Sequence, residues 1–374
     1  MEAPRSLWLA SGRRKETSIV VVDERVRIAV EHWAPRFVNN GVDFNDFQRV
    51  TGEVERWDDW CRAWSACGAG YEQMGEAADR AGYHASAGQH FFHAAMAYHI
   101  GKFLFVHRRD EQRAAHEHVV RNYQRALPSF DVPGERVAIP YEGGATMPSI
   151  LRKPWHTPKP PVVILIPGLD SVKEELHVYG DDFLRRGMAV LAIDGPGQGE
   201  MEFDHPMRFD YEVPVGRAID FLQARPDLDA GRVGLLGVSL GGYYAPRAAA
   251  FEPRVKAAIS LAGFHSIADS FDQAPLLTRE AFVARLGVAD QQAARVALQR
   301  FDLRGHMEKV RCPLLVIMGR QDRVVPPEEA ERMAAEAGGE TELWMFEDGN
   351  HVCNNIPYKH RPQQADWMHR QLCG

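Results

Sequence analysis

Short apolar runs that alternate with helical segments are the feature that most constrains the fold of this chain. From residue 161 onward, six runs are rich in aliphatic and β-branched residues and have the length of single strands. Segments with a helical pattern separate them. Strands covered on both faces form continuous apolar runs, so this alternation predicts an α/β fold with a mostly parallel sheet. The predicted strands are 161–167, 188–194, 232–238, 255–263, 313–319 and 341–347, and the predicted helices are 175–186, 209–224, 240–251, 327–337 and 361–372.

The chain changes character near residue 131. Residues 44–128 carry helix formers and aromatics with almost no strand pattern, which predicts several packed helices. Directly afterwards, ERVAIPY and TMPSILRKP flank a Glu-Gly-Gly turn and predict a β-hairpin. We therefore predict a helical cap over 1–130 and a core over 131–374. One face of the helix expected within 86–107 carries Phe92, Met96, His99 and Phe103, and we expect this face to roof a pocket.

One connection between predicted strands is unusually long. No strand pattern occurs between Gly263 and Val310, and much of the segment has a helical pattern. Long connections of this kind between sheet strands are commonly lids or binding elements. We predict a helical insertion at about 264–310 that helps to close the pocket.

Composition excludes several classes of protein. The 374 residues carry a net charge of -7, which is opposite to the basic surface expected of a nucleic-acid-binding protein. The five cysteines show no CxxC spacing, so we expect free thiols and a cytoplasmic location. No apolar run has the length of a membrane span, and we expect no membrane association.

The sequence Gly237-Val238-Ser239-Leu240-Gly241 fits the pattern G-x-S-x-G. It follows a predicted strand and opens a predicted helix, which is the context of a nucleophile elbow. Small residues must flank the serine because the turn is tight. Ser239 is therefore the candidate nucleophile.

A serine nucleophile needs a base, and the base needs an orienting acid. His351 follows the last predicted strand, and Asp322 follows the strand before it. The order serine, acid, histidine is that of α/β-hydrolases. Asp348 is the alternative acid, although its Asp-Gly pair also suits a turn. For the oxyanion that develops on the substrate, we expect the backbone N–H groups of Leu169 and Leu240 as donors.

The strings IPGLDSVKEE, IDGPGQGE, GVSLGG, GRQDRVVP and EDGNH together resemble the α/β-hydrolase superfamily. More narrowly, the chain resembles the branch that contains 2,6-dihydroxypseudooxynicotine hydrolase and fungal polyketide-shortening hydrolases. The resemblance spans nearly the whole chain, including the N-terminal helical cap. It implies hydrolysis of a C–C bond next to a ketone, or shortening of a polyketide, without a metal or organic cofactor.

The resemblance also implies an acidic residue in the insertion. The nicotine-pathway member uses a glutamate there, whereas this chain reads SFDQAPLLTRE, so that Asp272 or Gln273 falls at the matching place. We name Asp272 and His99 as possible substrate contacts. The departure from the family pattern leaves an ester or thioester substrate open as an alternative.

Other functions can be distinguished by sequence features. The cap histidines, including His90 and His93, lack Cys or carboxylate partners at zinc spacing, so we expect no metal. GPGQG at 195–199 lacks the Lys-Ser/Thr of a phosphate-binding loop and predicts a structural turn. A catalytically silent ligand-binding hydrolase fold usually lacks a triad member, and this chain has all three. We expect a homodimer that acts on a small molecule.

Overall fold

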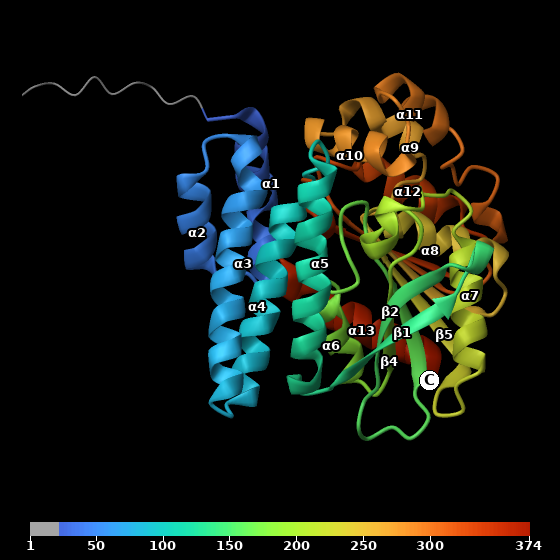
Figure 1. The fold of residues 1–374 in the computed structure, drawn as a ribbon. Coiled ribbons are helices and arrows are strands. Elements are labelled where there is room, and N and C mark those ends of the chain that lie inside the picture. The colour runs from blue at the N-terminus through green and yellow to red at the C-terminus, as the bar shows by residue number, and fades with distance from the viewer. Residues whose placement is uncertain (1–21) are drawn as a thin grey trace, which may run out of the picture.

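Five helices form the N-terminal part of the molecule. The computed structural model describes residues 22–374, and the five helices lie together on one side of the sheet (Figure 1). Helix α4 packs against both α3 and α5. The helices are α1 (Glu24–Asn39), α2 (Phe44–Glu53), α3 (Trp57–Arg80), α4 (His84–Lys102) and α5 (Arg109–Ala126).

Helix α1 begins before the helical region expected from the sequence. The Asp23 carboxylate caps it by accepting the N–H of Arg25 at 2.9 Å. Its apolar side chains Val26, Ala29, Trp33 and Phe37 are buried and recur at helical spacing. The helix continues through Pro35, a residue that normally ends or kinks a helix. Burial of the apolar stripe therefore outweighs the local signal of the proline.

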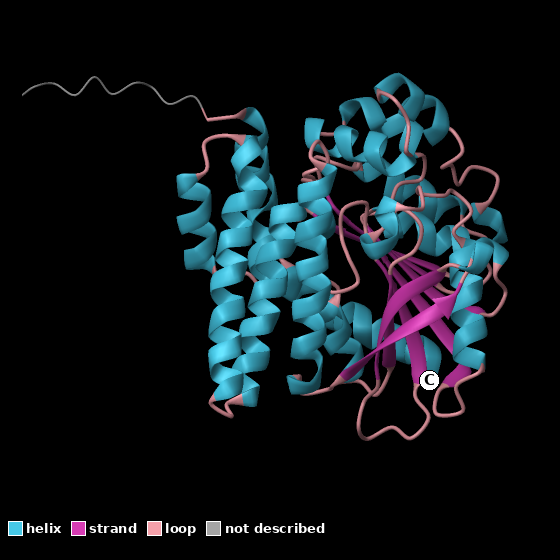
Figure 2. Cartoon of the chain, viewed as in Figure 1, coloured by secondary structure: helices cyan, strands magenta, loops and turns pink. Residues whose placement is uncertain are grey.

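The core is an eight-stranded sheet with helices on both sides (Figure 2). The strand order is β1-β2-β4-β3-β5-β6-β7-β8. The hairpin β1–β2 and the pair β2–β4 are antiparallel, and every other pair is parallel. The strands are β1 (Gly134–Pro140), β2 (Thr146–Arg152), β3 (Pro161–Ile166), β4 (Ala189–Ile193), β5 (Asp229–Val238), β6 (Val255–Leu261), β7 (Leu314–Gly319) and β8 (Thr341–Phe346).

The predicted α/β-hydrolase fold is confirmed, and all six predicted parallel strands are present. Every residue of β3, β4 and β7 is buried, which explains their uninterrupted apolar sequences. Helices α6 and α13 pack together, as do α7 and α8. The helices of the core are α6 (His177–Leu184), α7 (Glu212–Gln223), α8 (Leu240–Phe251), α12 (Pro327–Glu336) and α13 (Pro357–Cys373).

The segment predicted as an insertion is helical and lies at the top of Figure 1. It contains α9 (Ile267–Ser270), α10 (Leu276–Leu286) and α11 (Gln291–Leu298). A bridge between Ser266 and Asp302 joins its two ends. The short 3-10 helices of the chain are η1 (Leu127–Ser129), η2 (Glu142–Gly144), η3 (Gly199–Phe203), η4 (Phe271–Gln273), η5 (Met307–Lys309) and η6 (His351–Cys353).

The limits of the cap (1–130), the core (131–374) and the insertion (264–310) stay a prediction, and the three names refer to these ranges. Of the cap, residues 1–21 lie outside the described part of the chain. Within residues 22–374, no helix combines the length and the apolar character needed to cross a bilayer.

Candidate active site

Ser239 occupies a sharp turn between β5 and α8. Its backbone has φ 58° and ψ −115°, a conformation that is strained for a residue other than glycine. A side chain at Gly237 would collide with the backbone of Gly241, and one at Gly241 would collide with the carbonyl of Ile166. Only glycine fits at these two positions. The sequence pattern G-x-S-x-G is thus explained by the geometry of the turn, as expected for a nucleophile elbow.

The structure brings together the three residues predicted as a triad. His351 Nε2 lies 2.9 Å from Ser239 Oγ, and His351 Nδ1 lies 2.7 Å from Asp322 Oδ2. The other Asp322 oxygen accepts the N–H groups of Val324 and Val325 at 2.8 and 2.9 Å. These bonds fix the carboxylate. The arrangement can move a proton from the serine hydroxyl to an imidazole that a carboxylate orients.

The alternative acid, Asp348, lies apart from this relay. Its carboxylate is exposed and pairs with Lys359 at 2.5 Å. That ion pair with Lys359 holds the pKa of Asp348 below its ordinary value. The structure therefore favours Asp322 over Asp348 as the partner of His351.

The two predicted oxyanion donors flank the serine. Leu240 is the first residue of α8, so its N–H has no acceptor within the helix. The loop after β3 lies against Ser239, because a Cβ on Gly168 would stand 3.2 Å from Ser239 Cβ. Leu169 belongs to this loop. Donation by the N–H groups of Leu169 and Leu240 to an oxyanion stays a prediction.

The turn predicted as structural at 195–199 supports this loop. Gln198, which is fully buried, donates from Nε2 to the carbonyl of Pro167 at 2.5 Å. The hydroxyl of Tyr211 donates in turn to Gln198 Oε1. From the insertion, Arg285 Nε donates to the carbonyl of Leu169 at 3.2 Å. The hydrogen bonds from Gln198 and Arg285 both hold the backbone of this loop.

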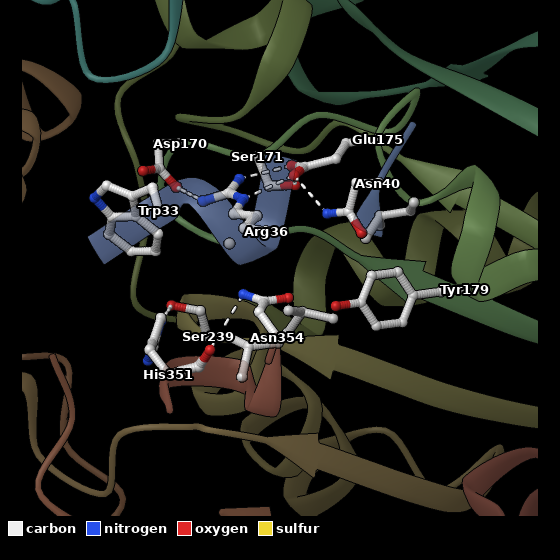
Figure 3. Close-up of a pocket in the computed structure, with 14 residues that line it drawn as sticks. Trp33, Arg36, Asn40, Asp170, Ser171, Glu175, Tyr179, Ser239, His351 and Asn354 are labelled. Atoms are coloured by element: carbon white, nitrogen blue, oxygen red, sulfur yellow. Dashed lines mark hydrogen bonds and ion pairs between the residues drawn. The ribbon is translucent and has the colours of Figure 1, made fainter. Parts of the chain in front are cut away.

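A small cavity lies beside Ser239 and is shown in Figure 3. Its volume is about 20 Å³, which is room for about one water molecule. The cap, the loop after β3, α6 and the segment around His351 all contribute to its wall. The lining residues are Trp33, Arg36, Asn40, Gly168, Asp170, Ser171, Glu175, Leu176, Tyr179, Val238, Ser239, His351, Val352 and Asn354.

The cap residues that line the cavity come from α1 and from Asn40, which directly follows it, and not from the predicted helix face. His99 does not line it; its Nε2 lies 3.1 Å from Glu175, behind the cavity wall. Phe103 packs edge-on against Trp33, with ring centroids 5.3 Å apart. The face expected to roof the pocket therefore forms a second layer that supports α1. The prediction placed this face one layer too close to Ser239 because it did not include α1.

Asp272, the other predicted substrate contact, also lies away from the cavity. It sits in η4, is exposed, and forms an ion pair with Arg295 of α11. Gln273 is exposed as well. The acids that do line the cavity are Asp170 and Glu175, from the string DSVKEE that follows β3. Polar residues directly after a buried strand were the signal that could have identified them.

The acids Asp170 and Glu175 share one counter-ion from the cap. Arg36 donates to both Glu175 oxygens at 2.7 and 2.6 Å and to Asp170 Oδ1 at 3.2 Å. Burial would raise the pKa of Glu175, but Arg36 and then His99 outweigh it and hold this pKa well below its ordinary value. Burial would lower the pKa of Arg36, but the two acids raise it instead. The guanidinium and the Glu175 carboxylate are therefore both charged.

Of the two cap histidines considered as metal ligands, His93 is engaged with other groups. His93 Nδ1 lies 3.0 Å from the carbonyl of Gly41, and its ring stacks on Tyr71. Among residues 22–374, no three His, Cys, Asp or Glu side chains gather in a way that could hold a metal ion.

Known proteins resemble this chain over most of its length. A 2,6-dihydropseudooxynicotine hydrolase from Paenarthrobacter nicotinovorans is 31% identical over 343 residues, covering 90% of this chain and 91% of that protein. A fungal relative, the alpha/beta hydrolase pydG of an Acremonium species, is 34% identical over 246 residues, covering 61% of this chain and 57% of that protein.

The solved structures give the same result. The crystal structure of 2,6-dihydroxy-pseudo-oxynicotine hydrolase matches with a TM-score of 0.83 and 30% identity, over 91% of this chain and 95% of that one. Residues 44–373 match the family described as FrsA-like, Esterase FrsA-like. The chain belongs to this FrsA-like family of α/β-hydrolases and is an enzyme of the hydrolase class.

Proposed function

We propose that this enzyme is a serine hydrolase that cleaves a C–C bond next to a ketone in an aromatic or β-dicarbonyl compound. The observation that carries the proposal is the hydrogen-bonded chain from Ser239 through His351 to Asp322, with steps of 2.9 and 2.7 Å, beneath a closed cap. The likeness to 2,6-dihydropseudooxynicotine hydrolase, over nine tenths of both chains, supports the C–C specificity.

The proposed reaction begins with attack by Ser239 Oγ on the carbonyl carbon while His351 Nε2 takes the hydroxyl proton. The oxygen that becomes negative is held by the N–H groups of Leu169 and Leu240. The C–C bond then breaks, its electron pair goes to the leaving carbon, and that carbon takes the proton back from His351. Water, deprotonated by the same imidazole, hydrolyses the acyl-serine and restores the enzyme.

This chemistry restricts the substrate. An imidazole of pKa about 6.5 cannot protonate a simple alkyl carbanion as it forms, because such a carbanion is far too basic. The leaving carbon must therefore be stabilised by an electron sink. A hydroxylated ring or a second ketone supplies one.

Two polar groups on the cavity wall suit a substrate of this kind. Asn354 Nδ2 donates to the carbonyl of His351 at 3.1 Å, which leaves its buried Oδ1 without a partner among residues 22–374. Figure 3 shows the hydroxyl of Tyr179 directed toward the Asn354 amide. A substrate hydroxyl between them could donate to Asn354 and accept from Tyr179. We propose these two side chains as its anchors.

An ester or thioester is the second candidate substrate. The same relay would form the same acyl-serine, and the matching family is described as Esterase FrsA-like. The acids of the cavity wall do not discriminate between the two reactions, since both pass through a tetrahedral oxyanion.

A substrate panel separates the two candidates. Aryl ketones, 1,3-diketones and aryl esters of matched size are compared at equal concentration, and the products are identified by mass spectrometry. We expect carboxylic acid and the protonated leaving carbon from the ketones. Turnover of the esters alone, with no product of C–C cleavage, would replace the proposal with a cap-gated esterase.

A further inference from the structure

The loop that follows β3 is held in place by a residue of the cap. Loop residues Asp170 and Glu175 both bind the guanidinium of Arg36, which projects from α1 (Figure 3). Ser171 joins them by donating to Glu175 Oε2 at 2.5 Å. These contacts begin at the residue next in sequence to Leu169, the predicted oxyanion donor.

Arg36 is well placed to impose this geometry. Its side chain and those of both acids are at most 10% exposed, so the ion pairs are largely shielded from water. The fork-shaped contact with Glu175 fixes both distance and orientation. Ring packing of Arg36 on Phe103, with the guanidinium carbon 4.7 Å from the ring centroid, holds the arginine itself.

Two further anchors of the loop come from outside the cap. Gln198 of the core binds the carbonyl of Pro167, and Arg285 of the insertion binds the carbonyl of Leu169. Arg36 is the guanidinium that the cap contributes, beside Asn40, which donates to Glu175 Oε1 at 2.8 Å, and His99, whose Nε2 lies 3.1 Å from Glu175 Oε2. Without Arg36, the carboxylates of Asp170 and Glu175 would share a buried site with no guanidinium between them, and buried like charges separate or take up protons.

We propose that Arg36 is a positioning residue that couples closure of the cap to formation of the oxyanion hole. With the cap docked, Arg36 holds Asp170 and Glu175, and through them it holds the N–H of Leu169 toward Ser239. With the cap undocked, the loop relaxes and the hole loses one donor. The enzyme then reacts only when its site is shielded from water. This proposal rests on the serine chemistry proposed above, but not on the identity of the substrate.

The test uses a fluorophosphonate, because phosphonylation of a serine needs the oxyanion hole and no natural substrate. The rate of labelling of the full chain is measured for wild type, for Arg36→Lys, and for the charge-balanced variant Arg36→Met, Glu175→Gln, which removes one positive and one negative charge. Arg25→Met is the matched control. Arg25 lies on the same helix but pairs with Glu280 of the insertion, at 2.6 Å, and does not touch the loop. Circular dichroism and thermal melting verify that each variant is folded.

We expect the charge-balanced variant to be labelled about 10- to 100-fold more slowly than wild type, since loss of a whole donor costs about 100- to 1000-fold. Arg36→Lys keeps the charge but loses the fork, so we expect a smaller decrease of about 3- to 10-fold. Arg25→Met should stay within about twofold. The pH profile of labelling should keep its shape in every variant, whereas a general disturbance of the site would change it.

Two outcomes would overturn the proposal. One is labelling within about twofold of wild type by a folded Arg36 variant; if the charge-balanced variant does not fold, Arg36→Lys decides. The other is an equal decrease in Arg25→Met, which would indicate general loosening of the cap. Failure of the wild type to be labelled would be a different result, since it would refute Ser239 as the nucleophile and with it the proposed function.

Discussion

The indole of Trp33 stands edge-on to the imidazole of His351, with ring centroids 5.7 Å apart and an interplanar angle of 83°. One ring belongs to the first helix of the described chain and the other to η6, which follows the last strand, β8. Trp33 is 4% exposed, and Phe103 packs behind it. The cap thus contacts the proposed general base directly.

Replacing Trp33 with alanine should enlarge the cavity and destabilise the protein. Large-to-small changes of a buried tryptophan cost about 3–5 kcal/mol of unfolding free energy. We expect a lower melting temperature and a relative gain for bulkier aryl substrates, measured as kcat/KM across a size series. Trp33→Phe keeps most of the side-chain volume. Its melting temperature and its size preference should therefore lie between those of the wild type and those of Trp33→Ala. An unchanged size preference in Trp33→Ala would show that the indole does not shape the pocket.

Replacing Ser239 with alanine should abolish turnover without unfolding the chain. The elbow accommodates alanine because the side chain becomes smaller while the flanking glycines stay. Removal of the nucleophile in serine hydrolases with this relay costs about 10⁶-fold in kcat. The measurement is kcat on whichever substrate the panel identifies, with circular dichroism as the control. A kcat within about tenfold of wild type would mean that another residue attacks.

The two acids near His351 should differ sharply in effect. Asp322→Asn leaves the histidine without the acceptor for its Nδ1 proton, and the corresponding change in serine proteases with the same relay lowers kcat by about 10⁴-fold. Asp348→Asn removes only an exposed ion pair with Lys359 and should change kcat by less than about twofold. Kinetics of the two variants side by side check this, and the opposite ranking would reassign the acid.

A histidine of α1 should make the stability depend on pH. Burial and, second, the neighbouring His351 lower the pKa of His32 to about 4, whereas an unfolded chain has about 6.5. Between these values the unfolded chain binds a proton that the folded chain does not, so stability falls as the pH decreases from 6.5 toward 4. Urea unfolding at about pH 7 and about pH 5 measures this loss.

The variant His32→Gln isolates that contribution. Other buried histidines, such as His360 with a pKa lowered by burial to about 3, are present in both proteins and cancel. We expect the wild type to lose about 1–2 kcal/mol more than the variant between about pH 7 and pH 5. Equal losses in both proteins would mean that His32 titrates normally in the fold.

Much of the core could be predicted from the sequence because its signals are local. The strands β3, β5 and β7 are continuous apolar runs over their buried lengths, and a strand buried on both faces requires such a run. The proposed nucleophile, Ser239, was recognisable because the turn that carries it accepts glycine alone at Gly237 and Gly241. The order of Ser239, Asp322 and His351 along the chain then assigned their roles.

The walls of the site could not be predicted in the same way because they depend on tertiary contacts. Helix α1 contains Pro35, a residue that disfavours a helix interior, and it is stabilised by burial against the rest of the cap. The pairing of Arg36 with Glu175 spans 139 positions of sequence and leaves no local pattern. His99 points toward the cavity, but Glu175 lies between its ring and the cavity. Helical spacing does not encode this distance between the side chain and the cavity.

The volume of the cavity has a consequence for how ligands bind. A space that holds one water molecule cannot hold a ketone with its flanking carbons. A substrate can therefore bind only to those protein molecules in which the site is wider. The affinity observed in an assay is then the intrinsic affinity multiplied by the fraction of molecules in that form. Compounds that resemble the substrate will therefore show a lower affinity in an assay than their contacts in the site would give. Changes that loosen the contact between α1 and the core can tighten binding while they slow the chemistry.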